Sequence, residues 1–288
     1  NRASIGVQDF DPGIQKIIGR IQSYDVTRNA VEELRARGIN SLNADILFGL
    51  PEQSQKRISD SVQMLLSLAP DRVALYGYAH VPWMARRQAM IPTDSLPRPE
   101  ERLELFETAR RLFKWDGYQD IGIDHFAKPE DGLAMAARTG HLRRNFQGYT
   151  DDTCDVLIGL GASAISKFPQ GFAQNAAGTA DYQKAVRAGE LATGRGHCFK
   201  GEDRLRARMI EALMCDFHIN SAEISDAFGV SGQALETLYR EAELAFPAMV
   251  KWDSEGFEIR PEGRALARLI ARTFDEYEMR EEGHSSAI

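Results

Sequence analysis

The stretch from Leu42 to Pro51 constrains the fold of this chain more than any other part of the sequence. It reads Leu-Asn-Ala-Asp-Ile-Leu-Phe-Gly-Leu-Pro, a short apolar run with one carboxylate, Asp45, and a Gly-x-Pro corner at its end. Apolar runs of this length, closed by glycine and proline, are typical of strands covered on both faces, as in parallel sheets. We therefore expect a buried strand with a single acidic group in its middle.

Strands and helices alternate around this stretch. Residues 4–8 predict a first strand, helical periodicity flanks the Asp45 strand on both sides, and residues 71–78 predict a third strand. Three consecutive strand–helix units favour a parallel α/β sheet, in which the loops at the carboxyl ends of the strands build the site. Because three strands cannot close a barrel, we expect its other strands to lie upstream of Asn1.

The middle of the chain is less regular. Residues 100–115 predict an amphipathic helix and residues 119–124 a further strand, whereas residues 141–149 show neither helical nor alternating periodicity. The last segment is rich in arginine, amide and aromatic side chains, and loops of that composition bind ligands more often than they fill a core. We interpret it as a binding loop, and a solvated basic turn is the alternative.

The pattern changes to helices from about residue 200. The predicted elements are helices at residues 205–217, 221–228 and 231–246, a hairpin at 249–260, and a final helix from 261 to about 278. Three helices and a hairpin have the outline of a winged-helix domain. We therefore predict an α/β part at residues 1–199 and a mainly helical, winged-helix-like domain at residues 200–288.

Charge and cysteine content limit the class of protein. The chain has a net charge of −7, and residues 200–288 carry 11 basic and 18 acidic side chains, the wrong balance for a partner with a phosphate backbone. We therefore expect no nucleic-acid partner, and no apolar run is long enough to predict a membrane span. Cys154, Cys198 and Cys215 are too few and too scattered for a disulfide framework, which favours a cytoplasmic location.

Two polar residues stand at or near the ends of predicted strands. Gln8 closes the first strand and Asp45 lies within the second, where a barrel would direct them inward or to its mouth. An amide and a carboxylate at this place suit the hydroxyl or amino groups of a nucleotide-like ligand. A satisfied buried acid and a polar cap are an equally good interpretation of the sequence, because a buried aspartate almost always has a partner.

Two histidines, His80 and His125, each follow a predicted strand. As a pair they suit metal ligation or proton transfer near neutral pH, but a single histidine in a loop is more often a hydrogen-bonded loop residue. Because the sequence has no H-x-x-x-H or H-E-x-x-H spacing, we predict no metal site in this chain. We assign no catalytic residue.

Five stretches together resemble the oxygen-independent coproporphyrinogen III oxidase, or dehydrogenase, family of radical S-adenosylmethionine (SAM) enzymes. They are Ser4-Ile-Gly-Val-Gln-Asp-Phe10, Asp45-x-x-x-Gly49-Leu50-Pro51, Tyr78-Ala79-His80-x-Pro82, Asp124-His125-Phe126-Ala127-x-Pro129 and Asn145-Phe146-Gln147-Gly148-Tyr149. They stand in the family's order and cover the chain nearly end to end. The resemblance implies an incomplete (β/α)6 radical-SAM barrel, of which this chain holds strands four to six, followed by a mainly helical domain.

The resemblance also implies an activity for the full-length enzyme in haem biosynthesis. A reduced four-iron four-sulfur cluster splits SAM, and the 5′-deoxyadenosyl radical removes hydrogen from a propionate side chain of coproporphyrinogen III. Loss of carbon dioxide and one electron leaves a vinyl group, and a second round gives protoporphyrinogen IX. The implied partners are a tetrapyrrole substrate and an electron-donor protein, and the implied full-length enzyme is a monomer.

Seven cofactor contacts carry over from the family motifs. Those that match contacts to the first SAM molecule are Gln8, Arg20 and Asp45. Tyr78 stands where the barrel mouth meets the cofactor. Those that match contacts to a second SAM molecule or to the substrate region are Phe146, Gln147 and Ile165.

The cluster ligands of the family are absent from this sequence. They form a C-x-x-x-C-x-x-C loop after the family's first strand, and the three cysteines of this chain do not have the spacing to replace them. We therefore expect this chain to be the carboxyl-terminal portion of the enzyme, with the cluster ligands in the missing N-terminal part. Alone, it is expected to be inactive.

Three other functions stay open. A sister branch of the same family binds haem as a chaperone, and we expect it to lack the motif at residues 145–149, so a titration with haemin separates the two. A nucleic-acid binder with a winged helix would need a basic face. A barrel enzyme of the aldolase type would need a lysine or a metal constellation at the strand ends, and the sequence shows neither.

Overall fold

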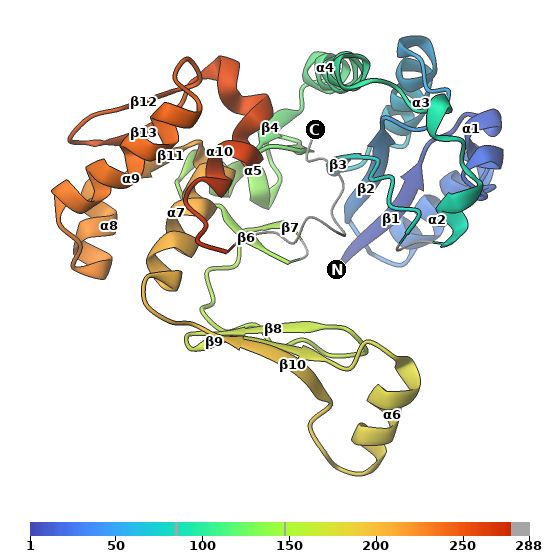
Figure 1. Ribbon diagram of the computed structural model, residues 1–288. Coiled ribbons are helices and arrows are strands. Elements are labelled where there is room, and N and C mark those ends of the chain that lie inside the picture. Colours follow the sequence, from blue (N-terminus) through green and yellow to red (C-terminus); the bar gives the residue numbers. More distant parts are fainter. Residues whose placement is uncertain (84–85, 147, 278–288) are drawn as a thin grey trace.

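Figure 1 shows the computed structural model, which describes residues 1–83, 86–146 and 148–277. Within these residues, the first part of the chain builds a five-stranded sheet in the order β1-β2-β3-β5-β4. Its strands are β1 (Arg2–Gln8), β2 (Ser41–Phe48), β3 (Arg72–Gly77), β4 (Gln119–Ile121) and β5 (His125–Ala127). The first three pair in parallel, as predicted, whereas β5 pairs in the antiparallel sense with both β3 and β4.

A hairpin replaces the single strand predicted at residues 119–124. Gly122, with a φ of 55°, adopts a left-handed conformation that favours glycine and turns the chain between β4 and β5. Ile121 before the turn and Phe126 after it are both buried, so the two short strands pack against each other and the core. His125 therefore lies in a strand and is buried, not in a loop after one.

Helices cover one face of this sheet. They are α2 (Tyr24–Ala36), α3 (Gln55–Ser67) and α4 (Pro99–Trp115). Side chains alternate along β2, so that Leu42 and Ile46 face these helices and pack with Val62 of α3 and Phe113 of α4 in the main core. We call the opposite face, which carries the intervening residues of each strand, the open face.

Short elements surround the sheet. Helix α1 (Pro12–Ile17) follows β1, and two 3₁₀ helices, Arg86–Met90 and Thr93–Ser95, lie between β3 and α4. At its β4–β5 side the open face is covered by α5 (Gly132–Arg138) and by the hairpin of β6 (Arg143–Asn145) and β7 (Gly148–Thr150). This hairpin corrects the irregular loop expected there, because strands of three residues are too short to show alternation.

Residues 165–198 form an element that the sequence did not predict. It is an antiparallel sheet in the order β10-β9-β8 with one helix: β8 (Ile165–Phe168), β9 (Gly171–Asn175), α6 (Thr179–Arg187) and β10 (Thr193–Cys198). We call it the arm, since it extends away from the rest of the molecule (Figure 1). Every residue of β10 is exposed and α6 buries none, so no buried apolar pattern marked these elements in the sequence.

The chain after residue 200 forms a C-terminal lobe around its own core. Its elements are α7 (Asp203–Asp216), β11 (His218–Asn220), α8 (Ser221–Phe228), α9 (Gly232–Ala245), β12 (Val250–Trp252), β13 (Gly256–Ile259), a 3₁₀ helix (Pro261–Leu266) and α10 (Ala267–Arg272). The three helices and the hairpin were predicted, and β11 adds a third strand to the hairpin. The aromatic rings of Tyr239, Phe257 and Phe274 fill the core.

The last helix is shorter than predicted. Gly263 is buried in the 3₁₀ helix, where an added Cβ atom would lie 2.6 Å from the Met249 carbonyl oxygen. This close packing against the residue before β12, and not helical periodicity, determines the backbone at this place. Residue 278, where we expected the helix to end, lies outside the described residues. In the described part of the chain, no helix combines the length and hydropathy of a bilayer span.

Candidate functional site on the open face

Strand pairing places one row of residues across the sheet. Gly6 of β1 pairs with Asp45 of β2, Asp45 pairs with Ala74 of β3, and Ala74 pairs with His125 of β5. Residues paired across neighbouring strands point to the same face. Because Leu42 and the other alternate residues of β2 face the helices, this row lies on the open face. Asp45 and His125 are thus separated by one small residue, Ala74.

Gln8 and Arg20 meet above Gly6 in this row. A Cβ atom added to Gly6 would lie 2.8 Å from Gln8 Nε2 and 3.1 Å from Arg20 Nη2, and Arg20 donates a hydrogen bond to the Gly6 carbonyl at 2.8 Å. The register shifts between Gly6 and Gln8, whose φ is 70°, and this irregularity ends the strand. Since Gly6 pairs with Asp45, the structure brings Gln8, Arg20 and Asp45 together.

Asp45 is half-buried and oriented by a neighbour on its own strand. Asn43 Nδ2 donates to Asp45 Oδ1 at 2.7 Å and also lies 2.9 Å from Ser4 Oγ of β1. A carboxylate fixed in this way, next to an amide and a guanidinium, offers an acceptor and several donors within one small area. This combination suits a ligand that carries both positive and negative groups.

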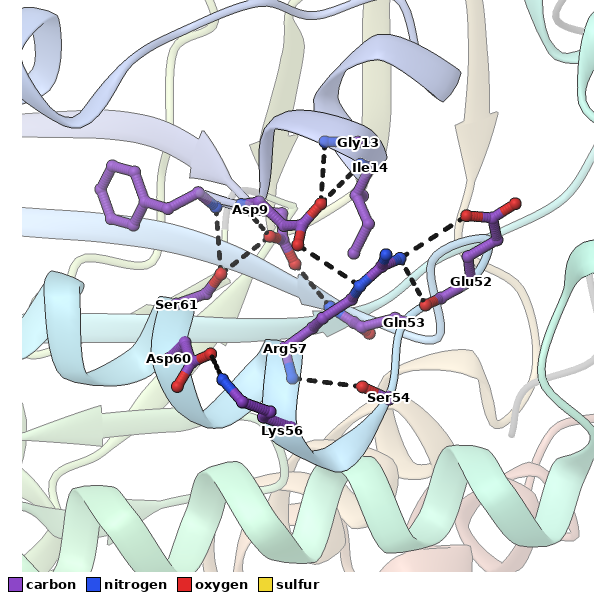
Figure 2. Close-up of polar contacts among 12 residues, drawn as sticks. Asp9, Gly13, Ile14, Glu52, Gln53, Ser54, Lys56, Arg57, Asp60 and Ser61 are labelled. Carbon is purple, nitrogen blue, oxygen red and sulfur yellow. Dashed lines mark hydrogen bonds and ion pairs between the residues drawn. The ribbon is translucent and has the colours of Figure 1, made fainter.

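A buried carboxylate next to Gln8 supports the ends of β1 and β2 (Figure 2). Asp9 is 0% exposed and accepts hydrogen bonds from Ser61 Oγ of α3 at 2.8 Å and from Gln53 Nε2 at 2.7 Å. Gln53 in turn accepts from the Gly49 backbone N–H at 2.8 Å. Burial raises the pKa of Asp9, and its hydrogen bonds offset only part of that effect. The network fixes the loops that follow both strands.

A second polar group lies at the β5 end of the row. His125 Nδ1 is 2.7 Å from Asp124 Oδ1, and its Nε2 is 3.5 Å from the Tyr76 hydroxyl. The rings of Tyr76 and Tyr149 stand edge-on to the imidazole, at centroid distances of 5.6 and 5.0 Å. The guanidinium carbon of Arg144 lies 5.5 Å from the centre of the Tyr149 ring. The imidazole is therefore held on several sides.

Charged side chains of the sheet region and of the C-terminal lobe shift the pKa values of Asp124 and Tyr76. Arg268 of α10 donates to Asp124 Oδ2. Burial acts to raise the pKa of Asp124, but the hydrogen bond with His125 and the charges of His125, Arg268 and Arg144 outweigh it, so the pKa is below its ordinary value. Burial, aided by the charges of Asp124 and Asp45, raises the pKa of Tyr76 to about 12. Asp124 is thus ionised and Tyr76 protonated at neutral pH.

Tyr78 is surrounded by apolar side chains. It follows β3, is 9% exposed, and packs with Ile14 and Leu50 in a small core. Burial raises the pKa of its hydroxyl, which has no hydrogen-bond partner in the described structure.

Two residues that were predicted to contact a second SAM molecule or the substrate region lie at the arm. Phe146, in the turn between β6 and β7, is exposed and meets Phe172 of β9 edge-on at a centroid distance of 4.9 Å. Ile165 is half-buried at the start of β8. Gln147, which was predicted together with Phe146, lies outside the described residues.

Some residues of the open face were not among the seven predicted cofactor contacts. His125 was considered for metal ligation or proton transfer, Arg144 belongs to the predicted binding loop at residues 141–149, and Asp124 stands next to His125 in one of the family motifs. Nothing in the sequence pairs Arg268 with Asp124, because the two are 144 positions apart. Among the described residues, no group of three or more histidine, cysteine or acidic side chains is arranged to hold a metal ion.

Comparisons with known proteins place the chain among named relatives. No protein-family model matches it. The oxygen-independent coproporphyrinogen III oxidase of Paracoccus denitrificans is 61% identical over all 288 residues, which cover 64% of that protein. The protein of the same name from Cereibacter sphaeroides (strain ATCC 17023) is 59% identical over 277 residues, 96% of this chain and 62% of that protein.

A solved structure agrees with these relatives. Coproporphyrinogen III oxidase from Escherichia coli, described as a radical SAM enzyme, matches with a TM-score of 0.90 at 33% identity, over 96% of this chain and 64% of that one. The chain therefore spans less than two thirds of the length of these relatives. Along its whole length the chain is thus similar to oxygen-independent coproporphyrinogen III oxidases, and it shares a mixed α/β fold with the Escherichia coli enzyme.

Proposed function

We propose that the protein containing this chain converts coproporphyrinogen III to protoporphyrinogen IX by oxygen-independent oxidative decarboxylation, with SAM as a cofactor. The observation that carries the proposal is that Gln8 and Arg20 meet above Gly6 of the open face, whose partner on the neighbouring strand is Asp45. These three residues also match the SAM contacts of the family motifs. The identity of 61% to a relative of that name supports the same activity.

Gln8, Arg20 and Asp45 fit the polar groups of SAM. Arg20 suits its carboxylate, Asp45 suits ribose hydroxyls or an amino group, and Gln8 can donate as well as accept. When bound, SAM supplies the 5′-deoxyadenosyl group that takes hydrogen from the substrate. The protein's part is to hold and orient polar groups at a site partly shielded from water, where fixed charges act more strongly than in solution.

The cysteines of this chain do not fit an iron–sulfur cluster. Cys215 is buried, and burial raises its pKa to about 12, which disfavours the thiolate that binds iron. Cys154 and Cys198 are exposed and do not group with other ligands in the described structure. We propose that the ligands of the four-iron four-sulfur cluster belong to the part of the longer protein that this chain does not span.

The proposal extends to architecture and partners. Strands β1 to β3 would be strands four to six of an incomplete (β/α)6 barrel within residues 1–199, with the open face as its interior. Residues 200–288 would form a winged-helix-like domain, which the separate core of the C-terminal lobe and its three-stranded sheet support. A tetrapyrrole substrate, an electron-donor protein, a monomeric full-length enzyme and a cytoplasmic location complete the proposal.

The substitution Asp45→Asn in the full-length protein tests this function. It keeps the size of the side chain and removes its charge, so we expect SAM to bind about tenfold more weakly or worse, as charge-assisted hydrogen bonds are lost. Equilibrium dialysis with labelled SAM measures the affinity, and chromatography of the products after anaerobic incubation measures turnover. Asp60→Asn is the matched control, because Asp60 is exposed on α3 and paired with Lys56.

Two results would contradict the proposal in different ways. Unchanged SAM affinity in the Asp45→Asn variant would remove Asp45 from the cofactor site. A wild-type full-length protein with a complete cluster that binds SAM but forms no protoporphyrinogen IX would refute the activity. If that protein instead binds haemin tightly, the haem-chaperone alternative gains support.

A further inference from the structure

The polar group around His125 has no part in the proposed contacts to SAM. It brings together residues from four elements and one turn: Tyr76 of β3, Asp124 of the β4–β5 turn, His125 of β5, Arg144 of β6 and Arg268 of α10. We call these five residues the His125 cluster. They are linked to one another by the hydrogen bonds, ring contacts and charges described above.

The His125 cluster has an excess of positive charge. Arg144 and Arg268 are always charged, and Asp124 is the one acidic member of the cluster. Asp124 accepts directly from Arg268, and Glu211, outside the cluster, accepts from the Arg144 backbone N–H at 3.1 Å and pairs with Arg208, so no carboxylate of the cluster pairs with the Arg144 guanidinium. Arg144 Nε is buried and has no hydrogen-bond partner in the described structure. A buried donor of this kind is costly unless an acceptor reaches it.

The imidazole of His125 is fixed with one nitrogen directed away from Asp124. Its Nδ1 is engaged by Asp124, and its two flanking tyrosine rings limit rotation. Its Nε2 lies beside Tyr76 and would be 3.4 Å from a Cβ atom on Gly148. In the imidazolium form, Nε2 carries a proton that can be donated to an acceptor at this place.

We propose that the His125 cluster is a carboxylate-binding subsite, in which His125 and Arg144 contact the carboxylate and Arg268 positions His125 through Asp124. The inference rests on the proposed function in taking the carboxylate to be a propionate of the tetrapyrrole substrate. The row Asp45–Ala74–His125 places this subsite two strands away from Asp45, with only β3 between them. A substrate held there would therefore lie next to the proposed SAM site and on the same face of the sheet.

Binding of coproporphyrin III to the full-length protein tests the subsite. This stable oxidised form of the substrate keeps its four propionates, and its tetramethyl ester lacks the charges. We expect Arg144→Met and His125→Asn each to weaken the binding of coproporphyrin III about tenfold, because each removes a charge-assisted hydrogen bond. Neither should change the affinity for the ester. Fluorescence titration of the tetrapyrrole measures both affinities.

The positioning role of Arg268 has its own readout. Arg268→Met should weaken the binding of coproporphyrin III by about threefold and change the ¹⁵N shifts of His125, whereas Arg268→Lys should restore both. Arg272→Met is the matched control, since Arg272 is exposed on the same helix, and it should change neither. The SAM affinity of each variant shows whether it is folded, because the residues above Gly6 lie across the sheet.

Each part of the subsite proposal has an experimental outcome that would overturn it. If Arg144→Met and His125→Asn bind coproporphyrin III as wild type does, or lose the ester to the same extent, there is no carboxylate subsite. If Arg268→Met and Arg272→Met behave alike, Arg268 does not position His125. A wild-type protein that binds coproporphyrin III through these residues but makes no protoporphyrinogen IX keeps the subsite and refutes the proposed function.

Discussion

Asp9 shows how one buried residue sets the geometry around the site. Its carboxylate accepts from the Asp11 backbone, from Ser61 and from Gln53, at 2.7 to 2.8 Å. An asparagine cannot replace it, because its amide nitrogen would face one of these donors. Gln53 cannot rotate to accept instead, since its Oε1 already accepts from Gly49. The end of β1, and with it Gln8, depends on this carboxylate.

We expect Asp9→Asn to lower the free energy of unfolding by about 1–3 kcal/mol, through unsatisfied buried donors. Burial raises the folded-state pKa of Asp9 above 3.8, so protonated Asp9 stabilises the wild type at low pH, and this contribution is lost as the pH rises through the raised pKa. The deficit of the variant should therefore be larger at about pH 4 than at about pH 7. Urea unfolding at both pH values measures it.

The control for this prediction is Asp60→Asn, which should stay within about 0.5 kcal/mol of wild type at both pH values, because Asp60 is exposed. A deficit of the Asp9→Asn variant that grows from acid to neutral pH would contradict the raised pKa.

At the scale of elements, the β4–β5 turn connects the sheet with its neighbours through Tyr149. The Tyr149 hydroxyl accepts from the Ile123 backbone at 3.0 Å and donates to the Met214 carbonyl of α7 at 2.8 Å. A Cβ atom on Gly122 would lie 2.2 Å from the Tyr149 ring. The turn therefore requires glycine for two reasons, its positive φ and the nearness of this ring.

Gly122→Ala is expected to lower the free energy of unfolding by about 3 kcal/mol or more, since strain in the backbone and overpacking add. Gly140→Ala separates the two effects: Gly140 has a φ of 69°, and an added Cβ atom would meet nothing within 4 Å. That variant should lose only about 1–2 kcal/mol from backbone strain. Equal losses in the two variants, measured by urea unfolding, would show that contact with Tyr149 does not matter.

The elements that could be predicted from the sequence are those whose own residues determine them. Strands β1 to β3 and helices α2 to α4 are long enough to show a buried period, and caps such as Ser54 start the helices. The strands of β6 and β7 and those of the arm could not be predicted, because they are short or bury little. In the candidate site, Gln8 and Asp45 followed from their strands, Arg20 needed the family motif, and Arg268 depends on tertiary packing alone.

At the scale of the whole molecule, the arm buries few of its residues. All residues of β10 are exposed, and α6 buries none. Local opening costs less free energy where few apolar side chains are buried. We therefore expect backbone amides of β10 that pair with β9 to exchange hydrogen at least about tenfold faster than those of β2, which corresponds to about 1.4 kcal/mol in opening free energy.

Hydrogen exchange followed by mass spectrometry measures this difference, and peptides from the buried α7 provide an internal reference. Equal protection of β10 and β2 would mean that the arm and the main sheet open as one cooperative unit.

The position of Asp124 has a consequence for how the open face and helix α10 influence each other. One carboxylate accepts from His125 on the open face and from Arg268 on α10. A ligand that changes the charge or the hydrogen bonds of His125 must therefore change the strength with which α10 is held. By thermodynamic reciprocity, a force or a partner acting on α10 changes the affinity of the open face by the same free energy.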